Sequence, residues 1–272
     1  MSAFGPRLRD ALLAGRREGR RGVGAPALRR SDGYEFSELR EYVEGDDPRR
    51  IDWAATARAG TVQSRVILED RALLLAVALD ASHSMHVGRT RSNYELASDV
   101  AALWYGAAID DDRFARIGRT PLVLRELAGR SAALACLAHR DPPGTPFEPA
   151  LQLALATLAR GARLLLVSDF FDLEALEPLL RACVARFDVT ALFVRDPWHA
   201  GLPLGGFVRL RDAESGRIAS VYVGRRSRER YARAVAAREQ AVLAALQRIG
   251  SRAGTLDEGA GPLRALARTF AL

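Results

Sequence analysis

The sequence predicts an α/β fold: a doubly wound, mainly parallel sheet with helices on both faces, preceded by an N-terminal arm and interrupted by a β-hairpin insertion. Short apolar runs of strand length recur along the chain, and segments with helical spacing of apolar residues separate them. Strands that are buried on both faces read as continuous apolar runs, and the alternation of strand and helix favours parallel βαβ units.

The predicted elements follow one another in a regular order. Each predicted strand is a short apolar run that ends at a polar residue or a turn, and each predicted helix has apolar residues three and four positions apart. The strands are predicted at 73–79, 113–117, 122–124, 163–167, 189–194 and 254–256. The helices are predicted at 94–109, 131–138, 147–158, 173–186, 227–249 and 262–270.

Two segments depart from this alternation. Residues 1–70 are polar and arginine-rich, with one predicted strand at 62–68, and are expected to form an arm ahead of the domain at 71–272. Two strand-like runs, 207–211 and 218–223, flank a polar turn that contains glycine. They predict the β-hairpin insertion, at about 205–224.

The composition excludes several classes of protein. No run of the 272 residues approaches the roughly 18 apolar residues of a membrane span, so a soluble, cytoplasmic protein is expected. All 40 basic residues are arginine, which excludes a Walker A phosphate loop and a Schiff-base lysine. Arginine is interleaved with acidic residues, so the net charge of +7 indicates a solvated surface and no nucleic-acid partner is expected. Cys136 and Cys183 are expected to be buried free thiols.

Five oxygen-bearing side chains stand where predicted strands end or a predicted helix begins: Asp80, Ser82, Ser84, Thr145 and Asp169. In an open parallel sheet, ligands bind beyond the carboxyl ends of the strands. The alternate spacing Asp-x-Ser-x-Ser allows a turning loop to point three oxygens at one spot, and hard divalent cations prefer oxygen ligands. We expect a cation site, with Mg²⁺ first and Mn²⁺ or Ca²⁺ as alternatives. An acidic side chain from a partner could complete its coordination shell.

These five positions resemble the metal-ion-dependent adhesion site (MIDAS) of von Willebrand factor type A domains. Those domains carry Asp-x-Ser-x-Ser after the first strand, a threonine in a later loop and an aspartate after the fourth strand. The resemblance covers about residues 71–200. It implies a von Willebrand factor A-like fold and a site that binds a partner.

The arm sharpens this resemblance. The run from Gly33 to Tyr42, followed by the run from Gly45 to Trp53, is similar to the signature of the bacterial DUF58 family, whose members carry a von Willebrand-like domain. That resemblance implies a partnership with a MoxR-type AAA+ ATPase and with an unknown client protein. Many members of the family have N-terminal membrane helices, a feature that this sequence does not show.

The charged and aromatic residues of the arm allow two interpretations. In the first, the arm packs on the core through Phe36, Leu39, Ile51 and Trp53. In the second, it offers a docking surface for a partner, formed by Arg40, Asp46, Asp47, Arg49 and Trp53.

The expected function is a non-enzymatic, metal-dependent protein-interaction module, an adaptor for an AAA+ ATPase in protein assembly or maturation. The alternative is a metal-dependent hydrolase that uses the Asp80/Asp169 site, which would need a general base that the sequence does not make evident. Two interpretations that involve no metal also remain open. Thr145 could cap the helix that follows it, and Asp110–Asp112 fits a helix-terminating turn better than a cation site.

Overall fold

The computed structural model describes residues 4–14, 35–43, 48, 51–68, 72–109, 111–118, 123–138, 140–199, 201 and 203–272. The chain divides into two compact units. The larger unit comprises Met1–Ala25 and Leu73–Leu272, and the smaller one is Pro26–Ala72.

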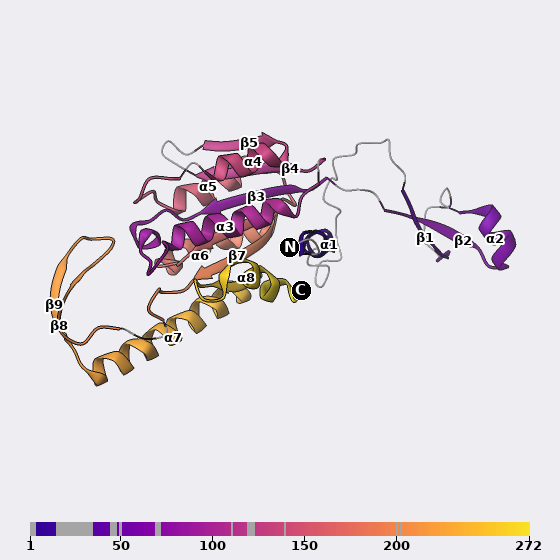
Figure 1. The fold of residues 1–272 in the computed structure, drawn as a ribbon. Helices are drawn as coiled ribbons and strands as arrows, with labels where there is room; N and C mark the ends of the chain where they lie inside the picture. The colour runs from indigo at the N-terminus through magenta and orange to yellow at the C-terminus, as the bar shows by residue number, and fades with distance from the viewer. Residues whose placement is uncertain are drawn as a thin grey trace. The chain divides into compact units, whose positions relative to one another are not determined.

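A six-stranded sheet forms the centre of the larger unit (Figure 1). Its strands are β3 (Leu74–Leu79), β4 (Arg113–Gly118), β5 (Val123–Ala128), β6 (Arg163–Ser168), β7 (Asp188–Val194) and β10 (Arg252–Leu256). Their order across the sheet is β10-β7-β6-β3-β4-β5, and every neighbouring pair is parallel except β4 and β5. The predicted doubly wound, mainly parallel sheet is confirmed.

Helices cover both faces of this sheet (Figure 1). One face packs against α1 (Phe4–Ala14), α3 (Asn93–Gly106), α4 (Arg130–Leu137) and α8 (Gly261–Phe270). The other face packs against α5 (Glu148–Thr157), α6 (Leu173–Arg186) and α7 (Arg225–Arg248).

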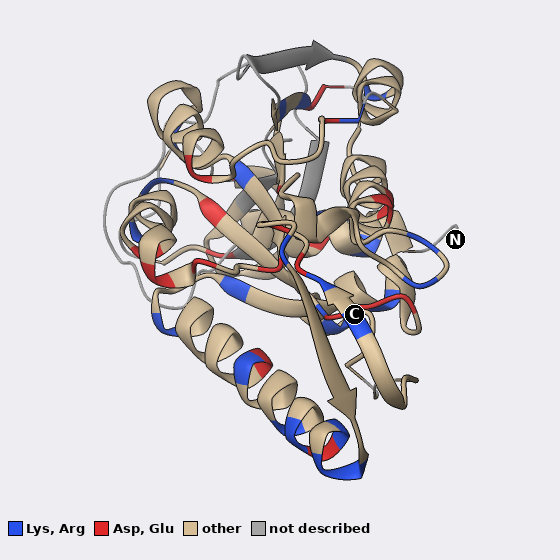
Figure 2. Cartoon of the chain, turned by 90° about the vertical axis from the view of Figure 1, so that its left-hand side faces the viewer, with Lys and Arg blue, Asp and Glu red and all other residues tan. Residues whose placement is uncertain are grey.

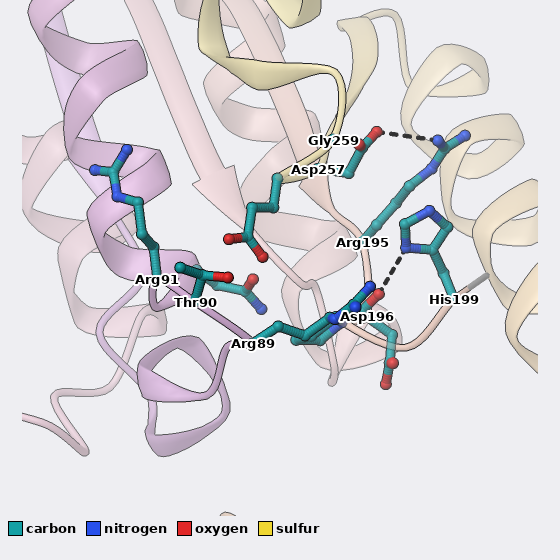
Figure 3. A pocket seen from close by; sticks show the side chains of 11 residues that line it. Arg89, Thr90, Arg91, Arg195, Asp196, His199, Asp257 and Gly259 are labelled. Carbon is teal, nitrogen blue, oxygen red and sulfur yellow. Dashed lines mark hydrogen bonds and ion pairs between the residues drawn. The ribbon is translucent and has the colours of Figure 1, made fainter. Parts of the chain in front are cut away.

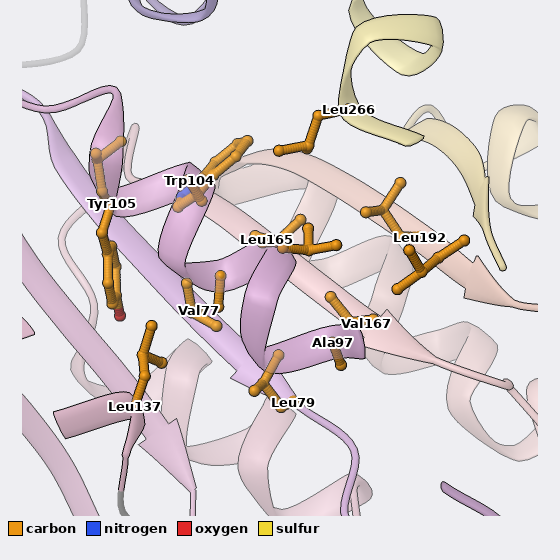
Figure 4. Close-up of a cluster of buried hydrophobic side chains, with 14 of the residues drawn as sticks. Val77, Leu79, Ala97, Trp104, Tyr105, Leu137, Leu165, Val167, Leu192 and Leu266 are labelled. Atoms are coloured by element: carbon orange, nitrogen blue, oxygen red, sulfur yellow. The ribbon is translucent and has the colours of Figure 1, made fainter. Parts of the chain in front are cut away.

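Successive residues of the central strands contribute their side chains alternately to the two hydrophobic cores. In β3, Leu75, Val77 and Leu79 join the α3 side, whereas Ala76 and Ala78 join the α5 side. Figure 4 shows the first core, where Trp104 of α3 and Leu266 of α8 pack over the strand residues. Because both faces of each central strand are buried, alternation of polar and apolar residues disappears and a continuous apolar run remains.

The β-hairpin insertion is also confirmed. β8 (Gly206–Arg211) and β9 (Ile218–Val223) pair in antiparallel register, from Gly206 opposite Val223 to Arg211 opposite Ile218. Most of its side chains are exposed, including Phe207, which is 85% exposed. The hairpin therefore stands away from the two cores.

Helix α1 is the main element that the sequence analysis missed in the larger unit. Residues 1–70 were expected to form one arm, but Leu8 and Leu12 of α1 are buried in the core on the α3 side. Arg9 of α1 forms a buried ion pair with Asp112, which ends the turn after α3. Asp112 thus stabilises the turn after α3, in agreement with the helix-terminating turn predicted at Asp110–Asp112.

The smaller unit contains an antiparallel pair, β1 (Glu35–Glu41) and β2 (Gln63–Leu68), and helix α2 (Trp53–Ala59). The Asp52 side chain caps α2 by accepting a hydrogen bond from the Ala55 backbone N–H at 3.0 Å. Neither β1 nor α2 was predicted, because this segment lacks the apolar runs that mark elements of a core.

Three composition-based expectations can be compared with the described residues. Cys136 and Cys183 are buried free thiols, as predicted. Among the described helices, none is both long and apolar enough to cross a membrane. The exposed start of α7 is mostly basic, and its glutamate Glu229 pairs with Arg225 (Figure 2).

Candidate metal centre

The candidate site lies where the winding direction of the sheet changes. β3 is followed by α3 on one face, and its neighbour β6 is followed by α6 on the other face. The loops after these two strands therefore diverge at a switch point of the sheet, and in open α/β sheets ligands usually bind at such a point. Asp80 follows β3 and Asp169 follows β6, and the Asp80 backbone N–H bonds to the Val167 carbonyl at 2.9 Å.

The Asp80–Ser84 loop folds back on itself at this edge. Asp80 is buried, and its Oδ1 accepts a hydrogen bond from the Ser82 backbone N–H at 2.9 Å. The hydroxyls of Ser82 and Ser84 lie 3.1 Å apart. The short 3₁₀ helix η2 (His83–His86) carries Ser84, and its turn brings the alternate side chains of the motif together.

A second loop brings Thr145 beside the first. Gly144 donates its backbone N–H to the Ala81 carbonyl at 2.8 Å, and Thr145 forms an antiparallel bridge with Ala81. Gly144 has φ of +83°, and a Cβ there would lie 2.3 Å from the His83 ring, so only glycine fits. The Thr145 hydroxyl donates to the Pro142 carbonyl at 2.7 Å, which leaves its oxygen lone pairs available.

Asp169 completes the group from β6. The Ser84 side chain lies near enough to lower the pKa of the Asp169 carboxyl, and an Arg238 N–H from α7 donates to the Asp169 carbonyl at 3.0 Å. The next residue, Phe170, has φ of +47°, a conformation that residues other than glycine rarely adopt. Burial of the Phe170 ring, beside Phe147, holds this strained turn in place.

Ser168 is a site residue that the sequence analysis missed, because the predicted strand ended at 167 and the predicted ligand was the next residue, Asp169. It is fully buried, donates its hydroxyl to Asp80 Oδ2 at 2.5 Å and accepts from the Phe170 backbone N–H at 2.8 Å. Ser168 therefore links the carboxylate of one strand end to the turn at the other. A single polar residue ending a wholly apolar strand was the available signal.

The electrostatics of the two carboxylates favour a cation. Burial raises the pKa of Asp80 above its usual value, hydrogen bonds from Ser168 and Ser82 oppose this, and the charge of Asp169 raises it again. Burial also raises the pKa of Asp169, against the effects of Ser84 and Arg238. Two partly desolvated carboxylates repel each other, and a divalent ion between them would relieve that cost.

The donor set fits a hard divalent ion. Two carboxylates and three hydroxyls offer oxygen ligands only, as Mg²⁺ requires. Within the described residues, no group of three or more His, Cys, Asp or Glu side chains has an arrangement that could hold a metal. Any metal at this edge would therefore depend on the hydroxyls of Ser82, Ser84 and Thr145 together with Asp80 and Asp169.

A stability measurement can test the position of Ser168. We expect Ser168→Ala to lower the free energy of unfolding by about 1–3 kcal/mol, because Asp80 Oδ2 and the Phe170 N–H both lose their partner. Thr190→Val is the matched control: Thr190 Oγ1 is buried in β7 and makes no hydrogen bond among the described residues. Equal losses for the two variants in chemical denaturation would contradict the role given to Ser168.

The sequence model of the family described as "Protein of unknown function DUF58" matches residues 38–241. The chain belongs to the DUF58 family. The match begins within the arm and extends through most of the larger unit, so the DUF58 resemblance of the arm is confirmed. The strand order, the antiparallel edge strand and the helices on both faces are those of a von Willebrand factor A-like domain, as that resemblance implied.

Relatives of this DUF58 protein include uncharacterized proteins of Mycobacterium bovis and Mycobacterium tuberculosis. Each is 31% identical over 232 residues, which is 80% of this chain and 73% of the relative.

Two solved structures are also similar. An aerotolerance-related membrane protein from Bacteroides fragilis matches 73% of this chain and 98% of its own, with 15% identity and a TM-score of 0.49. The conserved hypothetical protein BatB from Bacteroides thetaiotaomicron matches 73% of this chain and 97% of its own, with 17% identity and a TM-score of 0.48.

The DUF58 domain also has a cavity of about 400 Å³ at the ends of β7 and β10 (Figure 3). Two of its charged residues are paired across it: Arg195 bonds to Asp257 at 3.1 Å, and also to Glu239 of α7 at 2.6 Å. The His199 ring nitrogen Nδ1 lies 2.9 Å from the Asp196 carbonyl oxygen. These contacts give the cavity a structural role in joining β7, α7 and the loop after β10.

The predicted docking residues of the arm are only partly described. Trp53, at the start of α2, is 70% exposed. This exposure favours the interpretation of the arm as a docking surface over the interpretation in which Trp53 packs on the core. Asp46, Asp47 and Arg49 lie outside the described residues, as does the side chain of Arg40 in β1. The docking surface stays a prediction.

Proposed function

We propose that this DUF58 protein is a non-enzymatic interaction module that binds an acidic side chain of a partner through a divalent cation, Mg²⁺ first. One observation carries the proposal: Asp80, Ser84 and Asp169 converge at the switch point of the sheet, with the Thr145 loop bonded alongside. A bound cation would supply positive charge there.

The balance of charge in this set favours binding. The carboxylates of Asp80 and Asp169 together match the charge of one divalent ion, and the hydroxyl ligands add no charge. Ser82 and Ser84 are half-buried, so the site is open on their side. A carboxylate can therefore approach the site from this side, in keeping with the MIDAS-like motif.

The proposed partner is a MoxR-type AAA+ ATPase, and the family resemblance of the arm is its support. An adaptor of this kind would present an unknown client for assembly or maturation. Because the partner consumes ATP, the proposal assigns the module to the cytoplasm.

The test compares Asp80→Ala with Asp172→Ala, an exposed aspartate at the N-terminus of α6 that makes no capping bond. We expect calorimetry to show Mg²⁺ or Mn²⁺ binding for the wild type and Asp172→Ala, and none for Asp80→Ala, because the variant lacks one of the two carboxylates. Binding to a MoxR-type AAA+ ATPase of the same organism should require the cation and fail in Asp80→Ala. ATPase binding that persists in EDTA and in Asp80→Ala would refute the metal-bridged interaction.

The alternative function, hydrolysis at the Asp80/Asp169 site, predicts turnover of phosphoesters or peptides with Mg²⁺ or Mn²⁺. Turnover by the wild type that disappears in Asp169→Ala would establish an enzyme and contradict the non-enzymatic proposal.

A further inference from the structure

The tip of the β8–β9 hairpin reaches the candidate metal centre. Glu214 Oε1 accepts a hydrogen bond from the Ser84 backbone N–H at 2.7 Å, across 130 positions of sequence. Glu214 Oε2 lies 3.6 Å from Nδ1 of His83. A carboxylate of this chain thus contacts the same loop that carries three of the predicted ligands.

The turn is built to present this side chain. Asp212 Oδ1 accepts hydrogen bonds from the Ser215 backbone N–H at 2.7 Å and from its hydroxyl at 2.5 Å. The Gly216 N–H bonds to the Asp212 carbonyl at 3.0 Å, which closes the tip. Glu214 stands inside this closed turn, so its position is fixed by local hydrogen bonds.

The contact of Glu214 with the Ser84 N–H adds a third carboxylate beside the loop that carries Asp80. Like charges gathered at one site repel one another. The Ser84 N–H offsets part of this repulsion, and a cation would offset more. The Glu214 side chain is 40% exposed and comes from a mostly solvent-exposed hairpin, so it can leave without disturbing either core.

We propose that Glu214 is an internal acidic ligand, which the hairpin holds beside the site in the place of the partner's acidic side chain. Asp80, Asp169 and Glu214 do not by themselves form a metal-holding group in the described residues, so Glu214 would complete the shell of a cation already bound by the carboxylates and hydroxyls of the site. The hairpin and the partner then compete for one site, and the hairpin keeps the site covered until a partner displaces it. This inference rests on the proposed function, because both need a cation at Asp80 and Asp169.

The experiment uses Mn²⁺ alone as the probe and the full chain throughout. Calorimetry gives the Mn²⁺ affinity of the wild type, Glu214→Ala and Glu214→Gln, and hydrogen exchange follows Ser84 and residues 206–223 with and without Mn²⁺. We expect both variants to bind Mn²⁺ about tenfold more weakly. Mn²⁺ should slow exchange at the hairpin tip of the wild type only.

The glutamine variant separates a ligand from a plain hydrogen-bond acceptor. Its side-chain amide would keep an oxygen for the Ser84 N–H and lose the charge, so unchanged Mn²⁺ affinity in Glu214→Gln and in Glu214→Ala overturns the inference while the metal site stands. No Mn²⁺ binding by the wild type overturns the proposed function itself. Glu229→Ala, at an exposed glutamate of α7 paired with Arg225, is the control and should bind Mn²⁺ as the wild type does.

Discussion

We expect Asp112→Ala to lower the free energy of unfolding of the larger unit by about 3–5 kcal/mol, because it leaves the buried Arg9 charge without its carboxylate. The loss extends to two backbone groups. Asp112 accepts hydrogen bonds from the Leu73 N–H at 2.7 Å and the Ile109 N–H at 2.8 Å. One side chain therefore joins helix α1, the end of α3 and the entry to the central strand.

Neighbouring aspartate Asp111 provides the matched control for this prediction. It is exposed, and surface substitutions away from such contacts usually change stability by less than about 0.5 kcal/mol. Denaturation with urea, followed by circular dichroism, compares the two alanine variants with Asp112→Asn. Asparagine at this position keeps a hydrogen-bond acceptor but has no charge. The free energy of unfolding of Asp112→Asn should therefore fall by an amount between those of the two alanine variants. An Asp112→Ala variant as stable as Asp111→Ala would show that α1 docks by its apolar residues alone.

The same contact explains which parts of the fold the sequence could predict. The strands β3, β6 and β7 were predicted because burial on both faces leaves a continuous apolar run, a signal contained in the segment itself. Helix α1 was missed because it is short and carries Arg7, Arg9 and Asp10, and its Arg9 is buried against a partner 103 positions away, Asp112. No local pattern distinguishes such an arginine from one in solvent.

The residues of the candidate site also fall into two groups, those that the sequence could predict and those that it could not. Asp80, Ser84 and Asp169 could be predicted because strand ends and a recognised spacing mark them. Ser168 and Glu214 could not, since one looks like part of a strand and the other like an exposed turn. Their roles arise from the pairing of β3 with β6 and from the fold of the hairpin over the loop.

A buried ion pair holds the Thr145 loop, and its removal should have the second large effect. Asp141 Oδ2 lies 3.0 Å from Arg116 Nη2 and accepts from the Tyr94 hydroxyl at 3.2 Å. Both charged side chains are nearly excluded from solvent. A Cβ at Gly118 would lie 2.5 Å from Asp141 Oδ2, so the carboxylate needs glycine at that position.

We expect Asp141→Ala to lower the free energy of unfolding by about 3–5 kcal/mol, because the buried Arg116 charge loses this carboxylate. It should also weaken Mn²⁺ binding in calorimetry. Asp141 directly precedes Pro142, whose carbonyl accepts from both the backbone N–H and the hydroxyl of Thr145. A shift of this segment would move the threonine away from the other predicted ligands.

A double-mutant cycle separates the ion pair from simple loss of packing. If the charge of Arg116 causes the loss, Arg116→Met combined with Asp141→Ala should cost less than the sum of the single variants, with a coupling energy of about 0.5–3 kcal/mol. The exposed pair Glu177–Arg181 on α6 is the control, for which coupling below about 1 kcal/mol is expected. Coupling at Arg116 and Asp141 no larger than in that control would show that packing around Tyr94 holds the loop. In that case Tyr94→Phe, which removes only the hydroxyl, should leave Mn²⁺ affinity unchanged.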